Sequence, residues 1–149
     1  MKTKRENLEL RQATLDEIFA LRWEILRPNR PRAAAEFPGD DAPTTRHFAA
    51  LENGCVVGCL TFHASKWENQ PAWQLRGMAV APKRQRQGVG GKLLEFSEQA
   101  MRNTSPVRHL WCNARQTAIQ FYERQGWQIA SEEFEIPDAG PHVRMTKRL

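Results

Sequence analysis

A chain of 149 residues is long enough for one hydrophobic core and short for two, so we expect a single domain spanning residues 1–149. No segment approaches the ~20 consecutive apolar residues of a membrane span, and no secretory signal is visible, which predicts a cytoplasmic protein with no membrane partner. The formal net charge of +5 favours an anionic partner, either nucleic acid or a phosphorylated cofactor. The three cysteines form no Cys-x-x-Cys pair, so we expect neither a disulfide framework nor a metal site.

The N-terminal third predicts a strand, a helix and a long loop. Alternating residues predict the strand at 8–11, and Thr14 and Glu17 form a capping-box pair ahead of apolar residues at helical spacing. Pro28 ends this helix. It also opens the unpatterned segment 28–46, which we expect to be a loop.

A β-hairpin is the clearest structural prediction. Asn53-Gly54 supplies the two positive φ values of a type I′ turn between predicted strands 47–52 and 55–62. A further strand is predicted at 73–81. We expect one of its faces to carry Trp73, Leu75 and Ala79 and the other to carry Met78 and Val80.

The second half predicts two helices among the remaining strands. Helices are expected at 88–102 and from about 115 to 125, separated by a buried strand at 107–112. Strands at 127–136 and 142–145 complete the order β-α-β-β-β-α-β-α-β-β. This order implies an α/β (α+β) fold in which helices cover a mixed sheet.

The segment between the strand at 73–81 and the next helix is suited to an anion. Gly88 and Gly90 allow a phosphate to approach the backbone N–H groups at the helix N-terminus, where the helix dipole is positive. A Walker A loop is excluded, because Arg86 stands where it needs Gly and Leu93 where it needs Ser or Thr. A dinucleotide fingerprint fails as well, because Leu93 occupies its third small position.

Two segments together resemble the GNAT N-acetyltransferase superfamily. Gln85-x-x-Gly88-x-Gly90 is similar to the family's R/Q-x-x-G-x-G/A signature. The segment from Asn113 to Trp127 resembles its N-x-x-A-x-x-F/L-Y-x-x-x-G-F pattern, with Trp in place of the final Phe. The resemblance implies a mostly antiparallel central sheet flanked by helices, and transfer of an acetyl group from acetyl-CoA to an amine.

The resemblance also implies where coenzyme A would bind. Pantetheine would pair with the backbone of the central strand, and the pyrophosphate would lie on the amides of the glycine loop. The implied cofactor-binding residues are Met78, Ala79, Val80, Gln85, Arg86, Gln87, Gly88, Val89, Gly90, Gly91 and Asn113. The side chains of Arg84, Arg86 and Lys92 are expected to add positive charge. Asn113 has a second interpretation, as an N-cap of the following helix.

Tyr122 is the one tyrosine of the chain, and helical spacing places it on the inward stripe with its hydroxyl at the edge. The resemblance makes it the general acid that protonates the departing thiolate, while a core aromatic is the alternative. The oxyanion donor is expected to be a backbone N–H near Met78, where Gly77 permits a bulge.

Three candidates for the base that deprotonates the amine are His63, Glu68 and His142, with a water chain or a purely packing role as alternatives. We expect the acceptor to be an amine of a small molecule or a peptide, bound by loop 28–46 and the final strands.

In that loop Asp40 and Asp41 are expected to form a solvated tip, although they could attract a cationic amine. Two other functions stay open, and a homodimer is compatible with any of them. One is a coenzyme A-binding regulatory domain without catalysis. The other is a nucleic-acid-binding module, which we do not favour because the sequence lacks any recognition-helix, zinc or RNP signature.

Overall fold

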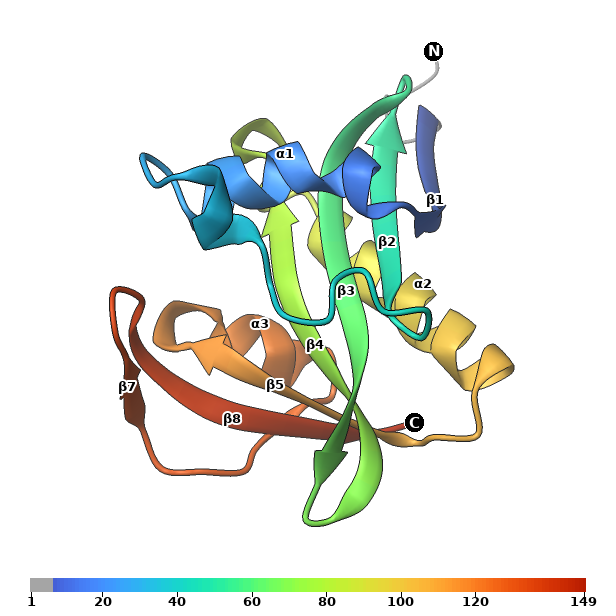
Figure 1. Cartoon of the computed structure of the whole chain (residues 1–149). Helices are drawn as coiled ribbons and strands as arrows, with labels where there is room; N and C mark the ends of the chain where they lie inside the picture. Colours follow the sequence, from blue (N-terminus) through green and yellow to red (C-terminus); the bar gives the residue numbers. More distant parts are fainter. Residues whose placement is uncertain (1–6) are drawn as a thin grey trace.

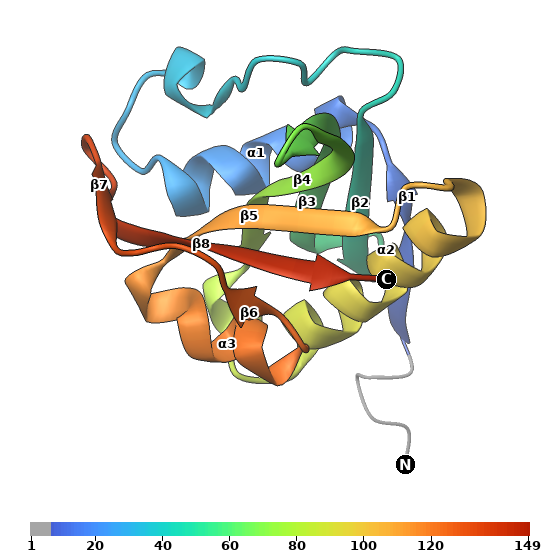
Figure 2. The same cartoon turned by 90° about the horizontal axis from the view of Figure 1, so that it is seen from below.

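The computed structural model describes residues 7–149, which form an eight-stranded sheet with helices on both of its faces (Figures 1 and 2). The elements are β1 (Leu8–Ala13), α1 (Leu15–Leu26), β2 (Arg46–Glu52), β3 (Cys55–Trp67), β4 (Gln70–Val80), α2 (Val89–Thr104), β5 (His109–Arg115), α3 (Ile119–Arg124), β6 (Gln128–Ile129), β7 (Phe134–Ile136) and β8 (Gly140–Arg148). None of the helices within this described range is long and apolar enough to cross a membrane.

The sheet is mixed and mostly antiparallel, which confirms the predicted fold class. Its strand order is β1-β2-β3-β4-β5-β8-β6, with β7 also paired to β8, and β4 with β5 is the parallel pair. The prediction of one continuous strand at 127–136 was wrong, because this segment is divided into β6 and β7, which pair with different parts of β8. The helix predicted from about 115 to 125 is shorter in the structure, because Arg115 still belongs to β5 and residues 116–118 form a 3₁₀ turn.

The parallel strands β4 and β5 diverge soon after they meet. Their pairing covers Trp73 to Leu75 on β4 and Leu110 to Cys112 on β5. Beyond these residues β4 continues along β3 while β5 continues along β8, so a wedge opens between them (Figure 1). This wedge, together with the start of α2, determines where the site can lie.

Two tight turns connect the central antiparallel strands. Asn53 and Gly54 adopt φ values of 50° and 80°, as predicted for the first hairpin. The sequence did not lead us to the second hairpin, at Glu68 and Asn69, whose φ values are 48° and 66°. Because of this turn, β3 extends to Trp67 and β4 begins at Gln70.

A β-bulge at Gly77 changes which face the side chains of β4 occupy. Leu60 of β3 lies opposite two residues, Gly77 and Met78, and Gly77 has a φ of 66°. Leu75 therefore packs in the core beneath α2 and α3, whereas Ala79 packs beneath α1. The prediction that Trp73, Leu75 and Ala79 share one face was wrong, because the extra residue reverses the alternation.

Helix α1 begins with the predicted capping box. The Thr14 hydroxyl accepts a hydrogen bond from the Glu17 amide at 3.3 Å, and the Glu17 carboxylate accepts one from the Thr14 amide at 2.9 Å. The helix ends at Leu26, just ahead of Pro28. It lies on one face of the sheet with residues 27–45, while α2 and α3 cover the other face (Figure 2).

Candidate active site

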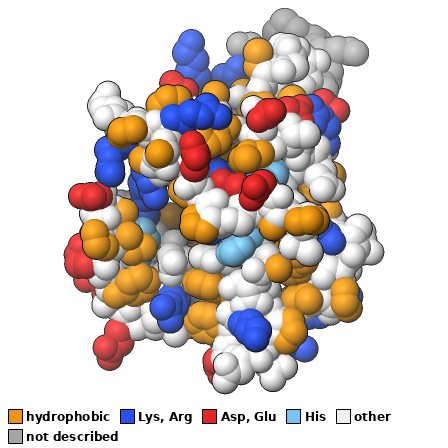
Figure 3. Space-filling view, in the orientation of Figure 1, with side chains coloured by type: hydrophobic (Ala, Val, Ile, Leu, Met, Phe, Trp, Pro, Cys, Tyr) orange, Lys and Arg blue, Asp and Glu red, His pale blue; other side chains and the backbone are white. Residues whose placement is uncertain are grey.

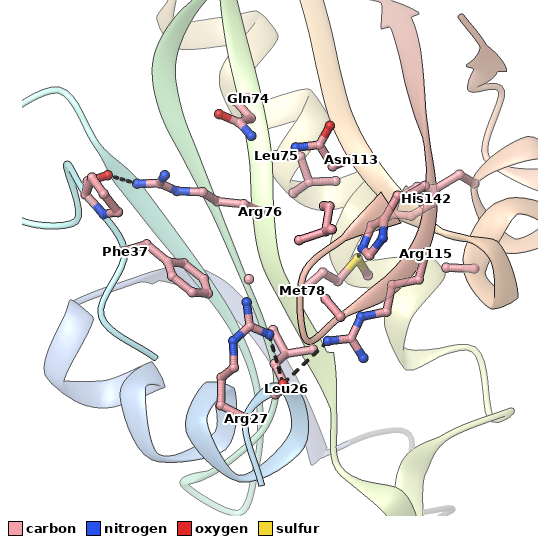
Figure 4. Close-up of a pocket in the computed structure, with 17 residues that line it drawn as sticks. Leu26, Arg27, Phe37, Gln74, Leu75, Arg76, Met78, Asn113, Arg115 and His142 are labelled. Carbon is pink, nitrogen blue, oxygen red and sulfur yellow. Dashed lines mark hydrogen bonds between the residues drawn. The ribbon is translucent and has the colours of Figure 1, made fainter. Parts of the chain in front are cut away.

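A cavity of about 270 Å³ lies in the wedge between β4 and β5 (Figure 4). Its walls come from the end of α1, the following loop, α3 and the β7–β8 hairpin. The loop contributes Phe37 and Pro38, and the hairpin contributes Ile136, Ala139 and His142. Both segments predicted to meet the acceptor therefore line the cavity. In the space-filling view, blue Arg and Lys side chains lie near the hollow to the left of centre (Figure 3).

Tyr122 reaches this cavity from α3. Its side chain is 8% exposed, its ring packs against Phe121 and Trp127, and its hydroxyl lies 3.8 Å from the sulfur of Met78. Burial raises the pKa of Tyr122 well above its usual value of 10, because the phenolate would lose its hydration. The hydroxyl is therefore protonated at neutral pH and can donate a proton inside the cavity.

The last residues of β4 have a free edge on the wedge side. Ala79 lies opposite Cys59, and the Ala81 amide donates to Val57 at 2.8 Å, so these alternate residues face β3. The backbone groups of Met78 and Val80 consequently point toward the wedge. The carbonyl oxygen of Val80 accepts a hydrogen bond from Gln85 Nε2 at 3.0 Å.

The glycine loop leaves the start of α2 open. Gly88 precedes the helix in a left-handed conformation with a φ of 84°, and no side chain caps the helix. Among residues 7–149, no acceptor bonds the backbone amides from Arg86 to Gly90. Consecutive N–H groups at a helix N-terminus form an anion site.

The charged side chains that flank this loop differ in whether an ion pair balances their charge. Arg84 forms an ion pair with Glu52, whose Oε2 lies 2.6 Å from Arg84 Nε, so much of its charge is already balanced. Arg86 and Lys92 line the same surface depression as Arg84, and they form no ion pair with another described residue.

Asn113 lies within β5 and not directly before a helix. The interpretation as an N-cap was wrong, because α3 begins six residues later and has no side-chain cap. Leu110, Cys112 and Ala114 face the α2–α3 core, so Asn113 projects from the opposite face and lines the cavity.

The three candidate bases are in different places. Glu68 lies in the β3–β4 turn, beside a separate depression, and accepts a hydrogen bond from Trp67 at 3.0 Å. His63 is bonded through Nε2 to Gln74 at 3.0 Å, and burial, followed by the charge of Arg76, lowers its pKa. Of these candidates, His142 lines the cavity.

His142 has a defined tautomer in its neutral state. Its Nδ1 lies 2.8 Å from the carbonyl oxygen of Gly140, and a carbonyl can only accept, so Nδ1 carries the hydrogen. Nε2 is then the nitrogen with a free lone pair. The side chain, 4% exposed, is positioned to take a proton from a ligand in the cavity.

Asp40 has a structural role that the sequence did not suggest. It is 7% exposed and forms two hydrogen bonds, at 2.6 and 3.1 Å, with the guanidinium of Arg22, which is fully buried. It also accepts from the amide of Phe37 at 2.9 Å, which fixes that ring in the cavity wall. Both expectations for Asp40 were wrong, since it is neither solvated nor available to a substrate, whereas Asp41 is exposed. Arg22 comes four residues after Ile18 and therefore lies on the same, inward face of α1. A cation on this buried face was the signal in the sequence for a buried acidic partner.

Sequence reasoning also missed three arginines that line the cavity: Arg27, Arg76 and Arg115. They come from separate elements, so no local pattern connects them. Within the part of the chain that the structure describes, no three His, Cys, Asp or Glu side chains gather as a metal site.

Comparison with known proteins gives a consistent result. A model of the acetyltransferase (GNAT) family matches residues 14–127. YitI of Bacillus subtilis, named as an uncharacterized N-acetyltransferase, is 29% identical over 148 residues, which covers 95% of this chain and 97% of the relative. The aminoalkylphosphonate N-acetyltransferase of Salmonella typhimurium is 30% identical, with coverages of 95% and 91%. A GNAT family acetyltransferase from Elizabethkingia anophelis, solved with acetyl-CoA bound, shares the fold with a TM-score of 0.71 at 17% identity, covering 97% of this chain and 99% of the other.

Proposed function

This chain belongs to the acetyltransferase (GNAT) family, and from that premise we propose that it transfers an acetyl group from acetyl-CoA to a primary amine of a small molecule or peptide. The observation that carries the proposal is the buried hydroxyl of Tyr122 in the wedge between β4 and β5, beside the uncapped start of α2. One relative is named for aminoalkylphosphonates, which supports a small amine as the acceptor, and the acetyl-CoA-bound neighbour supports the donor.

Backbone groups of the glycine loop and of the wedge-side edge of β4 support a specific placement of the donor. We assign the pyrophosphate to the unbonded amides from Arg86 to Gly90, where the helix dipole favours negative charge. Pantetheine then extends along Met78 and Val80, whose N–H and C=O groups face the wedge. This places the thioester beside Tyr122, and Asn113 across the wedge from β4.

The proposed reaction is a direct attack in a ternary complex. The neutral amine attacks the thioester carbonyl, and a backbone N–H at the Gly77 bulge stabilises the oxyanion. The intermediate then breaks its carbon–sulfur bond, and Tyr122 donates its proton to the departing thiolate. Nε2 of His142 takes the proton that the amine loses and then releases it to solvent, while Tyr122 recovers a proton from solvent.

A coenzyme A-binding domain without catalysis is less well supported. Such a domain needs the helix N-terminus but has no use for a buried, protonated phenol beside a histidine with a free Nε2. Its expected behaviour is binding without turnover.

Acetyl-CoA should raise the melting temperature of the protein. A ligand at 100 times its Kd adds about 2.7 kcal/mol to the free energy of unfolding, which corresponds to roughly 5 to 10 °C for a chain of this size. Thermal unfolding with and without acetyl-CoA measures the shift. S-acetylpantetheine, which lacks the pyrophosphate, is the matched control and should give a smaller shift. An unchanged melting temperature at millimolar acetyl-CoA would contradict the proposal.

A further inference from the structure

Three arginines surround the acceptor side of the cavity without an acidic partner. Arg27 follows α1, Arg76 lies on β4 and Arg115 ends β5, and all three line the wedge (Figure 4). Among residues 7–149 none of them forms an ion pair, and no Asp or Glu lines the cavity. Positive charge therefore accumulates here uncompensated.

Two of these guanidinium groups converge on one atom. Arg27 Nη1 donates to the carbonyl oxygen of Leu26 at 2.9 Å, and Arg115 Nη2 lies 3.4 Å from the same oxygen (Figure 4). Burial, and then the charge of Arg115, lower the pKa of Arg27. Bringing two cations together costs free energy, and one carbonyl at a helix C-terminus offsets only part of that cost.

The third arginine has a buried donor with no partner. Arg76 donates to the carbonyl of Pro38, but its Nε is buried and unbonded within the described residues. The guanidinium lies 5.5 Å from the centre of the Phe37 ring, and that of Arg27 lies 5.6 Å from it. Asp40, the acid that acts on Arg76, is already bonded to Arg22.

These arginines do not lie where coenzyme A places its phosphates under the proposed function. The loop assigned to the pyrophosphate leads into α2, which covers the opposite face of the sheet from α1 (Figure 2), whereas Arg27 directly follows α1 and lies over the Phe37 ring. His142, the proposed base, pairs with Arg115 across β5 and β8, so the two side chains share a face. The three arginines therefore surround the acceptor.

We propose that the acceptor is an amine that also carries an anionic group, a carboxylate or a phosphonate, and that Arg27 and Arg115 bind this group. The inference rests on the proposed function and defines its substrate class. Guanidinium groups bind carboxylate and phosphonate oxygens through paired, charge-assisted hydrogen bonds. A diamine would instead bring a second positive charge against the arginines, so polyamines are poor acceptors.

The test uses acceptors of equal length that differ in the second group. The full-length protein with acetyl-CoA is assayed for thiol release with β-alanine, 2-aminoethylphosphonate, 3-amino-1-propanol and 1,3-diaminopropane, together with the homologues that are one methylene shorter or longer. The better of the two anionic classes should exceed the amino alcohols and diamines in kcat/KM by at least about 100-fold. Whichever anionic class is preferred identifies the anion as carboxylate or phosphonate.

Substitutions then assign the preference to residues. Arg27→Gln and Arg115→Gln should each reduce the anionic preference by about 10-fold or more, through KM, while kcat/KM for 3-amino-1-propanol changes little. Arg102→Gln, an equal change of charge on the exposed side of α2, is the matched control and should keep the preference.

Three outcomes would overturn the inference. Equal or better turnover of the amino alcohols or diamines would do so while leaving the proposed function intact. An equal loss for all acceptors in Arg27→Gln and Arg115→Gln, with a lowered melting temperature, would assign the arginines to capping α1. Absence of turnover for every acceptor, with no stabilisation by acetyl-CoA, would contradict the proposed function and this inference together.

Discussion

Replacing Tyr122 with Phe should lower kcat by a factor of about 10² to 10⁴, the usual contribution of general acid catalysis. Phe keeps the ring that packs against Phe121 and Trp127, so the melting temperature and the affinity for acetyl-CoA should change little. The variant loses the proton that the thiolate receives as the carbon–sulfur bond breaks. Single-turnover thiol release, under conditions where chemistry is slower than product release, measures the effect.

Two comparisons make this result specific to proton donation. An acetyl thioester with a more acidic leaving thiol should be affected less by the substitution than acetyl-CoA. His142→Gln should instead slow both thioesters to a similar extent, because it removes the group that takes the proton from the amine and not the one that protonates the thiolate. Because burial raises the pKa of Tyr122 well above 10, the wild-type profile should show no decline from Tyr122 below that pH. Full kcat in Tyr122→Phe would reduce Tyr122 to a core aromatic and make solvent the acid.

A Gly91→Glu substitution should weaken acetyl-CoA binding by roughly 10² to 10³-fold. It adds a carboxylate to the first turn of α2, beside the amides assigned to the pyrophosphate. Two like charges about 4 to 6 Å apart repel by about 3 to 4 kcal/mol at an effective dielectric constant of 20. Titration calorimetry with acetyl-CoA gives the change in Kd.

Folding stability should move the opposite way in the same variant. Replacing Gly in a helix and placing an acid at its N-terminus are each favourable by up to about 1 kcal/mol. A Cβ at Gly91 would meet the tip of the Gln125 side chain at 2.9 Å, and that flexible amide can turn aside. Gly91→Gln is the neutral control of equal size. Unchanged affinity in Gly91→Glu, or an equal loss in Gly91→Gln, would remove the pyrophosphate from this loop.

Gly90 is less suitable for that test. Its Cβ would lie 3.3 Å from Phe121 and 3.4 Å from Val80, so a side chain there would disturb the packing of α2 against α3 and β4. Loss of binding would then have two explanations.

Features set by neighbouring residues were predictable from the sequence. The Asn53-Gly54 turn, the Thr14 capping box and the glycine loop each depend on the conformation or hydrogen bonding of a few consecutive residues. The helical register of Tyr122 followed in the same way, and it places this side chain in the cavity.

Features that depend on distant partners were not predictable by such rules. The expected bulge at Gly77 is present, but its reversal of the faces of β4 was not foreseen, nor was the approach of Arg22, whose Nε would lie 2.9 Å from a Cβ at Gly77. The burial of Asp40 depends on the same arginine, 18 residues away in the chain. The convergence of Arg27 and Arg115 requires β5 to end beside α1, which nothing in the local sequence indicates.

The most direct test of acetyl transfer is to quantify coenzyme A thiol and N-acetylated amine in the same reaction. With the wild-type protein, acetyl-CoA and the amine panel, we expect one equivalent of thiol for each equivalent of acetylated product. Both should require the amine, because direct attack forms no acetyl-enzyme. Stabilisation by acetyl-CoA with no acetylated product from any amine would contradict the account and identify a coenzyme A-binding domain without catalysis.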